Sequence, residues 1–213
     1  MVQTEKLQKK NPKGRGPQRH TKDDWIKIAL ETLIAEGVEN VKVMVLSAKL
    51  GTARSSFYWY FENREDLLET LLAHWRQTNT RAIVDSSGQP AQTITQAVVN
   101  VFASWVGQGQ FNTRLDFAVR DWARRSEAVR HMLDASDAER LQALTDMFAR
   151  FNIGAGEAEV RARILYYTQI GYEALDPRED WDTRVSRARD YLFCMTGQSP
   201  SEGDIERLSQ MRR

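Results

Sequence analysis

The chain has 213 residues, enough for one sizeable hydrophobic core or two small ones, and its 41% hydrophobic and 28% charged content is ordinary for a soluble globular protein. The formal net charge is only +1, so overall charge gives no argument for binding nucleic acid or a membrane. The charge is unevenly distributed, because residues 1–64 carry twelve basic and seven acidic side chains and the remainder carries eighteen and twenty-two. A basic front and an acidic rear suggest two tasks on one chain.

Cys194 is the only cysteine in the sequence, so no disulfide can form within the chain, which fits a reducing compartment. No apolar run approaches the roughly 18 residues that a membrane-spanning helix needs. The basic N-terminal residues are not followed by the apolar stretch of a secretory signal. These features predict a cytoplasmic protein outside the membrane.

Residues 1–20 carry six basic side chains against a single acidic one, and their two prolines and two glycines disfavour regular structure. We expect a flexible basic arm, with a merely solubilising tail as the alternative. Order is expected to begin at Thr21, because Asp24 three residues later completes a capping-box pattern. Gly37 is expected to end this first helix in a left-handed conformation.

The following segments also have helical patterns. A short apolar segment covers 41–50, another opens after Gly51, and Asn63 is expected to cap a fourth helix that reaches about residue 84. A loop is predicted at 85–90, and the helices predicted beyond it cover 94–105, 115–122, 126–153 and 157–175.

Asp176, Pro177 and Glu179 predict the start of the last clear helix, which ends near Gly197. No convincing strand and no internal repeat is found in the sequence. The predicted fold class is therefore all-α, with an N-terminal three-helix helix-turn-helix domain followed by a larger helical domain.

The stretch GTARSSFYWYFENRED (51–66) predicts the turn and second helix of a helix-turn-helix unit over residues 43–62. Ser47 is small where the two helices would cross, and Gly51 permits the tight turn between them. The second helix would enter the major groove of DNA by its N-terminal end. The side chains placed there, with donors for base edges or phosphates, are Arg54, Ser55 and Ser56.

The aromatic residues that follow are expected to have different tasks. Phe57 and Phe61 are four residues apart and should face the core, whereas Tyr58 and Trp59 should lie along the DNA. Tyr60 fits either the edge of the core or a phosphate contact. The alternative is that all five rings simply pack three short helices together.

The segment KLGTARSSFYWYFENREDLLETLLAHW (49–75) resembles the DNA-binding segment of the TetR family of bacterial transcriptional regulators. IALETLIAEGVENVKV (28–43) resembles the family's first helix and the approach to its second, and the specific resemblance covers residues 25–72. The residues that carry it are the Gly turn, the short recognition helix, a Tyr, an aromatic pair ending in Phe and an Asn-led fourth helix.

The resemblance implies that Tyr58 and Arg64 contact phosphates and that Arg54 and Trp59 lie in the groove. Met44 departs from the family's pattern, because a polar or basic residue is common there near the DNA backbone. The phosphate contact on that helix either moves to Lys42 or is lost.

The predicted domains are the basic arm at 1–20, the helix-turn-helix DNA-binding domain at 21–66 and a helical effector-binding and dimerisation domain at 67–213. In the family that the chain resembles, this larger part binds a small ligand and dimerises. Its many rings favour an apolar or aromatic effector, although such residues are more often core than pocket. The residues expected to bind the ligand are Trp75, Phe102, Trp105, Phe117, Arg120, Trp122, Tyr166 and Gln169. Asp116 and Asp121 are further candidates, and Asp116 with Arg120 fits an i, i+4 surface pair equally well.

The last two predicted helices have small and apolar residues at helical spacing, which favours a four-helix dimer interface around a twofold axis. An internal pair of helices is the alternative. The residues expected in the interface are Tyr167, Ile170, Gly171, Ala174, Val185, Ala188, Tyr191, Leu192 and Met195, with Ile164 beside them.

The predicted function is a homodimeric regulator that binds double-stranded DNA, a repressor released from a palindromic operator by a small ligand. A regulator without a small effector, controlled by a partner protein or acting as an activator, is the alternative. An enzyme is a remote one, because the three histidines are far apart and no phosphate-binding loop or nucleophile motif is present. No catalytic residue, metal or cofactor is therefore predicted.

Overall fold

The structure is a computed structural model that describes residues 20–106 and 111–211, and these residues form helices and connecting turns without a strand. The predicted all-α class is confirmed, with a helix-turn-helix unit at the N-terminal end and further helices after it. The basic arm predicted at 1–20 lies outside the described residues except for His20. No helix in the described ranges is both long and apolar enough to cross a membrane.

In chain order the described elements comprise α-helices, short 3₁₀ segments (η1, η2) and one π-helical segment (η3). They are α1 (Lys22–Glu36), η1 (Val38–Asn40), α2 (Val43–Leu50), η2 (Arg54–Trp59), α3 (Arg64–Trp75), η3 (Arg76–Thr80), α4 (Arg81–Ser87), α5 (Ile94–Trp105), α6 (Thr113–Ala123), α7 (Glu127–Ala149), α8 (Ala155–Leu175), α9 (Trp181–Ser186), α10 (Ala188–Thr196) and α11 (Glu202–Ser209).

The first helices begin and end for local reasons. The Thr21 side chain accepts a hydrogen bond from the Asp24 amide, and the Asp24 carboxylate accepts one from the Thr21 amide, which confirms the capping box. Gly51 ends α2 in the left-handed region, at φ 64° and ψ 33°. Gly37 differs from the prediction, because φ is 79° but ψ is 168° and the chain leads directly into η1.

Helices α3, η3 and α4 follow one another without a break and form one rod. The Asn63 side chain accepts a hydrogen bond from the Asp66 amide and caps the start of the rod as predicted. The π-helical turn of η3 lies in the middle of the rod, a geometry that often accompanies function. The rod continues to Ser87, so residues 85–87 are helical rather than part of the predicted loop.

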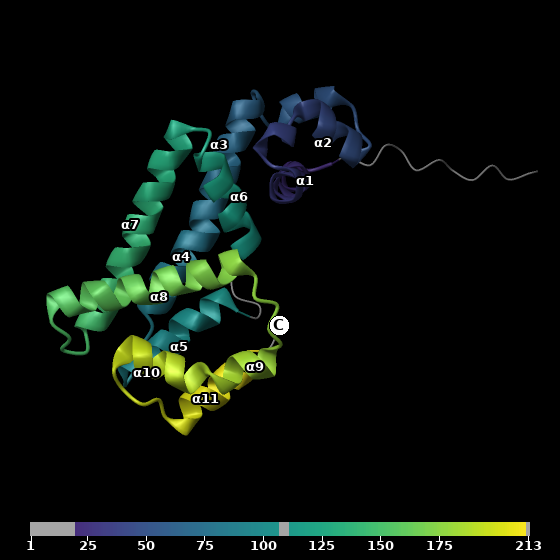
Figure 1. Ribbon diagram of the computed structural model, residues 1–213. Coiled ribbons are helices and arrows are strands. Elements are labelled where there is room, and N and C mark those ends of the chain that lie inside the picture. Colours follow the sequence, from purple (N-terminus) through teal and green to yellow (C-terminus); the bar gives the residue numbers. More distant parts are fainter. Residues whose placement is uncertain (1–19, 107–110, 212–213) are drawn as a thin grey trace, which may run out of the picture.

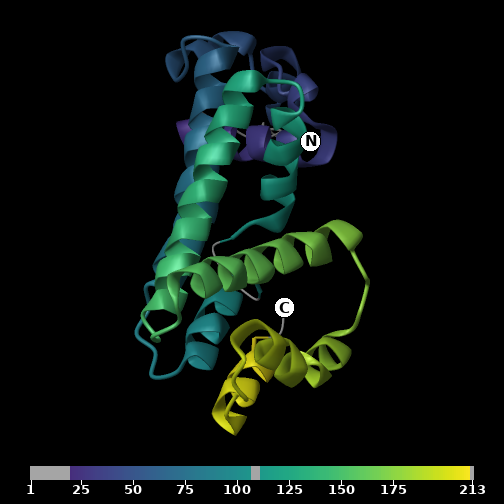
Figure 2. The same ribbon diagram turned by 60° about the vertical axis from the view of Figure 1, so that its left-hand side comes forward.

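The helix-turn-helix unit and the C-terminal helices α9–α11 lie at opposite ends of the molecule (Figure 1). Between them, the long helix α7 runs beside the rod, and α8 leads away from the end of α7 above α9–α11 (Figure 2). Helix α5 packs against both α10 and α11. The rod and α7 therefore lie between the C-terminal helices and the helix-turn-helix unit (Figure 2).

Two hydrophobic clusters organise the interior. The DNA-end core contains buried residues of α1 to α3 together with α6 and the start of α7, including Leu115, Trp122 and Val129. The far core is built from α4, α5, α7, α8, α10 and α11. The domain boundary proposed at residue 66 falls inside α3, and α6 packs against the helix-turn-helix unit as part of the same core.

The C-terminal helices differ most from the sequence prediction. Asp180 caps α9 with its carboxylate, whereas Asp176, the predicted cap, has a left-handed backbone at the end of α8. The single helix predicted up to Gly197 is divided at Arg187 into α9 and α10, and its predicted end is confirmed by a left-handed Gly197. Helix α11, which begins with a capping box, was not predicted.

Candidate nucleic-acid interface and ligand site

The helix-turn-helix unit of α2 and η2 is held from within by aromatic packing. Phe57 is fully buried, and its ring meets Trp25 edge to face at a centroid distance of 5.3 Å and stacks on Phe61 at 5.2 Å. The Thr52 amide donates to the Ser47 carbonyl at 3.0 Å and closes the turn between the two helices. The predicted core positions of Phe57 and Phe61 are confirmed, and they fix η2 against α1.

The other side of η2 presents a mixed basic and aromatic surface. Tyr58 and Trp59 are 60% and 67% exposed, whereas the neighbouring Phe57, which packs toward α1, is fully buried. Arg54 and Ser55 are exposed on the same short helix, and Lys42 is exposed just before α2. We call Lys42, Arg54, Ser55, Tyr58 and Trp59 the recognition surface.

Two other residues predicted to contact DNA have partners inside the protein. The Ser56 hydroxyl donates to the Ala53 carbonyl at 2.8 Å and reinforces the start of η2. The Tyr60 hydroxyl donates to the His20 carbonyl at 2.7 Å, and its ring packs on the DNA-end core. This geometry favours the edge of the core, the first of the two assignments left open for Tyr60.

Arg64 also donates inside the protein. Its Nε donates to the Val41 carbonyl at 2.6 Å, and its Nη2 donates to the Val38 carbonyl at 2.8 Å. The guanidinium therefore ties the start of the rod to η1 and to the segment before α2. Two of the Arg64 donors thus have partners in the protein, although the Val38 carbonyl also accepts from the Val41 amide at 3.1 Å. The phosphate contact implied for Arg64 by resemblance stays a prediction.

Residues 26–71 match the family model described as bacterial regulatory proteins, tetR family. These residues form a DNA-binding domain of the TetR family. The matched segment spans most of α1, the helix-turn-helix unit and most of α3, and it supports a DNA-binding transcriptional regulator. TetR-family proteins are regulators and not enzymes. Comparison with curated proteins gave no match.

Away from the recognition surface, a buried polar network joins the rod to three other helices. Asp116 of α6 and Arg140 of α7 are both fully buried, and Arg140 Nη2 donates to Asp116 Oδ1 at 3.0 Å. Trp75, at the end of α3, donates through Nε1 to the same oxygen at 2.9 Å. The Tyr166 hydroxyl of α8 accepts from Arg140 at 2.9 Å and donates to Asp137 at 2.7 Å.

Two further side chains complete this network. Arg120 donates to Asp116 at 2.9 Å and to both oxygens of Asp137 at 2.8 and 2.9 Å. Arg140 Nε also donates to the Thr80 hydroxyl of η3 at 3.2 Å. The predicted i, i+4 pairing of Asp116 with Arg120 is thus present, but the pair is not on the surface. We call Trp75, Thr80, Asp116, Arg120, Asp137, Arg140 and Tyr166 the α3–α8 network.

The charges of the network balance, because two carboxylates face two guanidinium groups. Burial by itself raises the pKa of Asp116, but Arg140 and Arg120 outweigh it, and the net pKa lies below the ordinary value. Burial raises the pKa of the Tyr166 hydroxyl, so it stays protonated and donates to Asp137. Within residues 20–106 and 111–211, no group of three or more His, Cys, Asp or Glu side chains is placed to hold a metal ion.

The residues expected to bind a ligand are not gathered in one place. Phe102 and Gln169 line a pocket near the C-terminal helices. Trp105 is buried and is not one of the lining residues, but its ring lies edge to face with that of Phe102 at a centroid distance of 5.6 Å. The other five lie in the α3–α8 network, in the DNA-end core or half-buried on α6, and are Trp75, Arg120, Tyr166, Trp122 and Phe117.

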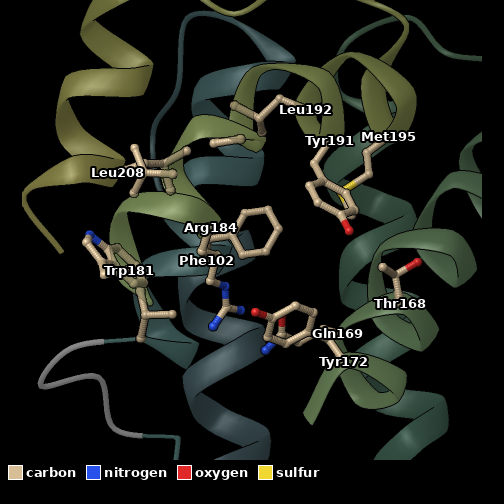
Figure 3. Close-up of a pocket in the computed structure, with 13 residues that line it drawn as sticks. Phe102, Thr168, Gln169, Tyr172, Trp181, Arg184, Tyr191, Leu192, Met195 and Leu208 are labelled. Atoms are coloured by element: carbon tan, nitrogen blue, oxygen red, sulfur yellow. The ribbon is translucent and has the colours of Figure 1, made fainter. Parts of the chain in front are cut away.

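The pocket lies between α5, α8, α9, α10 and the end of α11 (Figure 3). Its walls are mainly rings and aliphatic side chains, and it offers about 70 Å³ of space to water-sized molecules. Arg184 enters this lining with its Cζ 4.1 Å from the ring centroid of Tyr172 and 5.9 Å from that of Trp181. Sequence reasoning missed these three residues. For Trp181 and Arg184 the sequence held a usable signal, because they share a helical spacing with Ala188 and Leu192 and so lie on one helix face.

The residues expected in the dimer interface divide between two faces. Those of α9 and α10 line the pocket instead, because these helices turn that side toward α5 and α8: Val185, Ala188, Tyr191, Leu192 and Met195. Ile170 packs against the far core. Tyr167 lies on an exposed apolar stripe of α8, which we call the α8 stripe, and Ala174 is exposed near its end. The α8 stripe consists of Val160, Ile164, Tyr167, Gly171 and Leu175, of which the four apolar side chains are 44–82% exposed.

Proposed function

We propose that this TetR-family chain is a cytoplasmic homodimeric repressor that binds a palindromic operator and is released from it by a small apolar or aromatic ligand. The observation that supports DNA reading most directly is the recognition surface. Exposed large rings such as Tyr58 and Trp59 mark a surface that a partner covers. Lys42 and Arg54 provide the positive charge that attracts phosphates.

The proposed roles on DNA follow from the chemistry of each side chain. Arg54 can donate two hydrogen bonds to the edge of a guanine in the major groove. Ser55 and the Tyr58 hydroxyl suit phosphate oxygens, and the Trp59 ring suits a thymine methyl group. Lys42 supplies a phosphate contact from the start of α2, because the Met44 side chain has no hydrogen-bond donor for one.

A palindromic operator needs two recognition surfaces related by a twofold axis. The α8 stripe offers an apolar face for this pairing, because Ile164 and Tyr167 lie one turn apart and are both exposed. Gly171 continues the same stripe, and a Cβ added there would meet no atom within 4 Å, so a partner helix can approach closely. We propose that α8 forms the centre of the dimer interface.

Release by a ligand requires a link between the larger helical part and the recognition surface. The rod α3–η3–α4 starts at the recognition unit, and the α3–α8 network attaches it to α8 through Trp75 and Thr80. A ligand that binds the DNA-incompetent arrangement more tightly would shift the equilibrium toward it. We expect operator affinity to fall by about 1–3 kcal/mol, and operator DNA to weaken ligand binding by the same factor.

The experiment that tests DNA reading is selection of bound sequences from a random duplex pool by the full chain. The proposal expects enrichment of one twofold-symmetric motif with half-sites about one helical turn or more apart. Enrichment of an asymmetric motif would reject the dimeric arrangement, and no enrichment above the unselected pool would reject specific DNA reading.

One observation favours a regulator without a small effector as the second candidate. Beside the rod, the α3–α8 network fills the interior with paired side chains, whereas the pocket of Figure 3 is lined by residues of α5 and α8–α11 and by none of the rod. The two candidates differ in one measurement, the effect of pocket ligands on operator affinity. A compound that occupies the pocket and leaves the operator affinity unchanged supports the second candidate.

A further inference from the structure

The pocket between α5 and α8–α11 contains one cationic side chain in an otherwise apolar lining. Of the residues that line it, Arg184 is the cation, and neither an aspartate nor a glutamate is among them. Its described contacts are the ring faces of Tyr172 and Trp181, at 4.1 and 5.9 Å. Ring faces attract a guanidinium but leave its five N–H donors without acceptors.

Three carboxylates of α8, the following linker and the α9 cap have other hydrogen-bond or ion-pair partners, and one of them is Asp180, which accepts from the amide and hydroxyl of Thr183. Glu179 accepts from the Tyr172 hydroxyl at 3.1 Å and is ion-paired with Arg187. Glu173 accepts from the Gln169 amide at 3.0 Å. Within the described ranges no ion pair joins Arg184 to a carboxylate, so the lining keeps a net positive charge.

The shape of the pocket limits the size of what it takes. The space open to water-sized molecules, about 70 Å³, holds a few waters or a single small ring. Four aromatic side chains line it, namely Phe102, Tyr172, Trp181 and Tyr191 (Figure 3). A planar ring makes edge-to-face and stacked contacts with such walls.

We infer that this pocket binds a small carboxylic acid with one aromatic ring, held by a bidentate ion pair between its carboxylate and Arg184. The guanidinium fork matches a carboxylate geometrically, and the ring contacts hold the fork in place. The site is distinct from the one expected from the sequence, and it shares only Phe102 and Gln169 with it. Binding of this acid does not depend on the proposed function. Only its role as the effector that releases the protein from DNA rests on that function.

The test is isothermal titration calorimetry of the full, DNA-free chain with three ligands of one shape and different charge. They are phenylacetate, its neutral isostere phenylacetamide and the cation 2-phenylethylamine. We expect phenylacetate to bind at least about tenfold more tightly than the amide, and the amine to bind most weakly. Equal affinities for phenylacetate and phenylacetamide would overturn the inference without any substitution.

Substitutions then test whether Arg184 causes the preference for phenylacetate over phenylacetamide. Arg184→Gln should abolish the preference for the acid over the amide, and Arg184→Lys should retain part of it, because the charge stays but the fork is lost. Arg178→Gln is the matched control, since Arg178 is exposed on the nearby linker and outside the lining, and it should leave the preference unchanged. An Arg184→Gln variant that is folded by circular dichroism and still prefers the acid contradicts the inference.

The role of the acid as an effector is tested separately, by measuring operator affinity in its presence. Phenylacetate should lower operator affinity of the unmodified chain and leave that of Arg184→Gln unchanged. If the chain binds phenylacetate through Arg184 but selects no operator, the proposed function fails and the ligand site stands. If it selects an operator but shows no preference for the acid, the ligand site fails and the DNA-reading function stands.

Discussion

Substitution of Arg140 by Met tests whether the α3–α8 network holds the rod. The change removes the guanidinium that pairs with Asp116 at 3.0 Å and leaves that fully buried carboxylate with Arg120 and Trp75. Breaking one partner of a buried ion pair costs about 3–5 kcal/mol of unfolding free energy. For a chain of this size the thermal midpoint should fall by about 6–20 °C.

The effect should also depend on pH. The pKa of Asp116 is below its ordinary value in the folded protein, so its pairing stabilises the fold above the carboxyl's unfolded pKa and is lost as pH falls through the folded pKa. Without Arg140 the folded pKa of Asp116 rises. The difference in stability between the two proteins should therefore be largest near pH 7 and should narrow as the pH is lowered.

The assay is urea unfolding followed by circular dichroism at pH 7 and at pH 4.5, at one protomer concentration. Arg130→Met is the matched control on the same helix, because Arg130 forms an exposed i, i+4 pair with Asp134 and should cost less than about 1 kcal/mol. A loss below 1 kcal/mol for Arg140→Met, or equal losses for both variants, would refute the role given to the network.

The remaining predictions concern the recognition unit and the dimer. Arg64→Met should lower the unfolding free energy by about 1–3 kcal/mol, because the Val41 carbonyl loses the Arg64 donor and the Val38 carbonyl keeps only the Val41 amide. The DNA affinity of this variant, measured at a temperature where it is folded, should keep the salt dependence of the wild type. An unchanged stability with a flatter salt dependence of DNA binding would favour the phosphate contact over the structural role. Ile164→Glu on the α8 stripe should shift the chain toward monomer in sedimentation equilibrium and weaken operator binding, because the half-sites no longer act together. A variant that stays dimeric would place the interface elsewhere.

The fold was largely predictable because its signals are local. Capping residues such as Thr21 and Asn63, the turn at Gly51 and the apolar periodicity of the long helices each depend on a few neighbouring residues. The boundaries that failed depend on longer context. Asp176 and Asp180 both precede a helical pattern, and only packing decides which of them caps a helix.

The larger-domain site was poorly predicted for a related reason. Helical periodicity identifies which side chains face inward, but not whether the space they meet is filled. Arg140 gave a usable signal, since a charged residue occupies the apolar face of α7 between Leu133 and Leu144 and therefore needs buried partners. Its partners Asp116 and Tyr166 come from other helices, and no spacing within α7 could identify them.

Sequence-specific DNA binding by the recognition surface can be tested by one comparison of affinities. Dissociation constants for the selected operator and for a scrambled duplex are measured by fluorescence anisotropy at one salt concentration, with the wild type and with Arg54→Ala. We predict that Arg54→Ala weakens operator binding by about 1–3 kcal/mol and changes scrambled-duplex binding much less. Equal weakening on both duplexes, or no weakening on the operator, would contradict it.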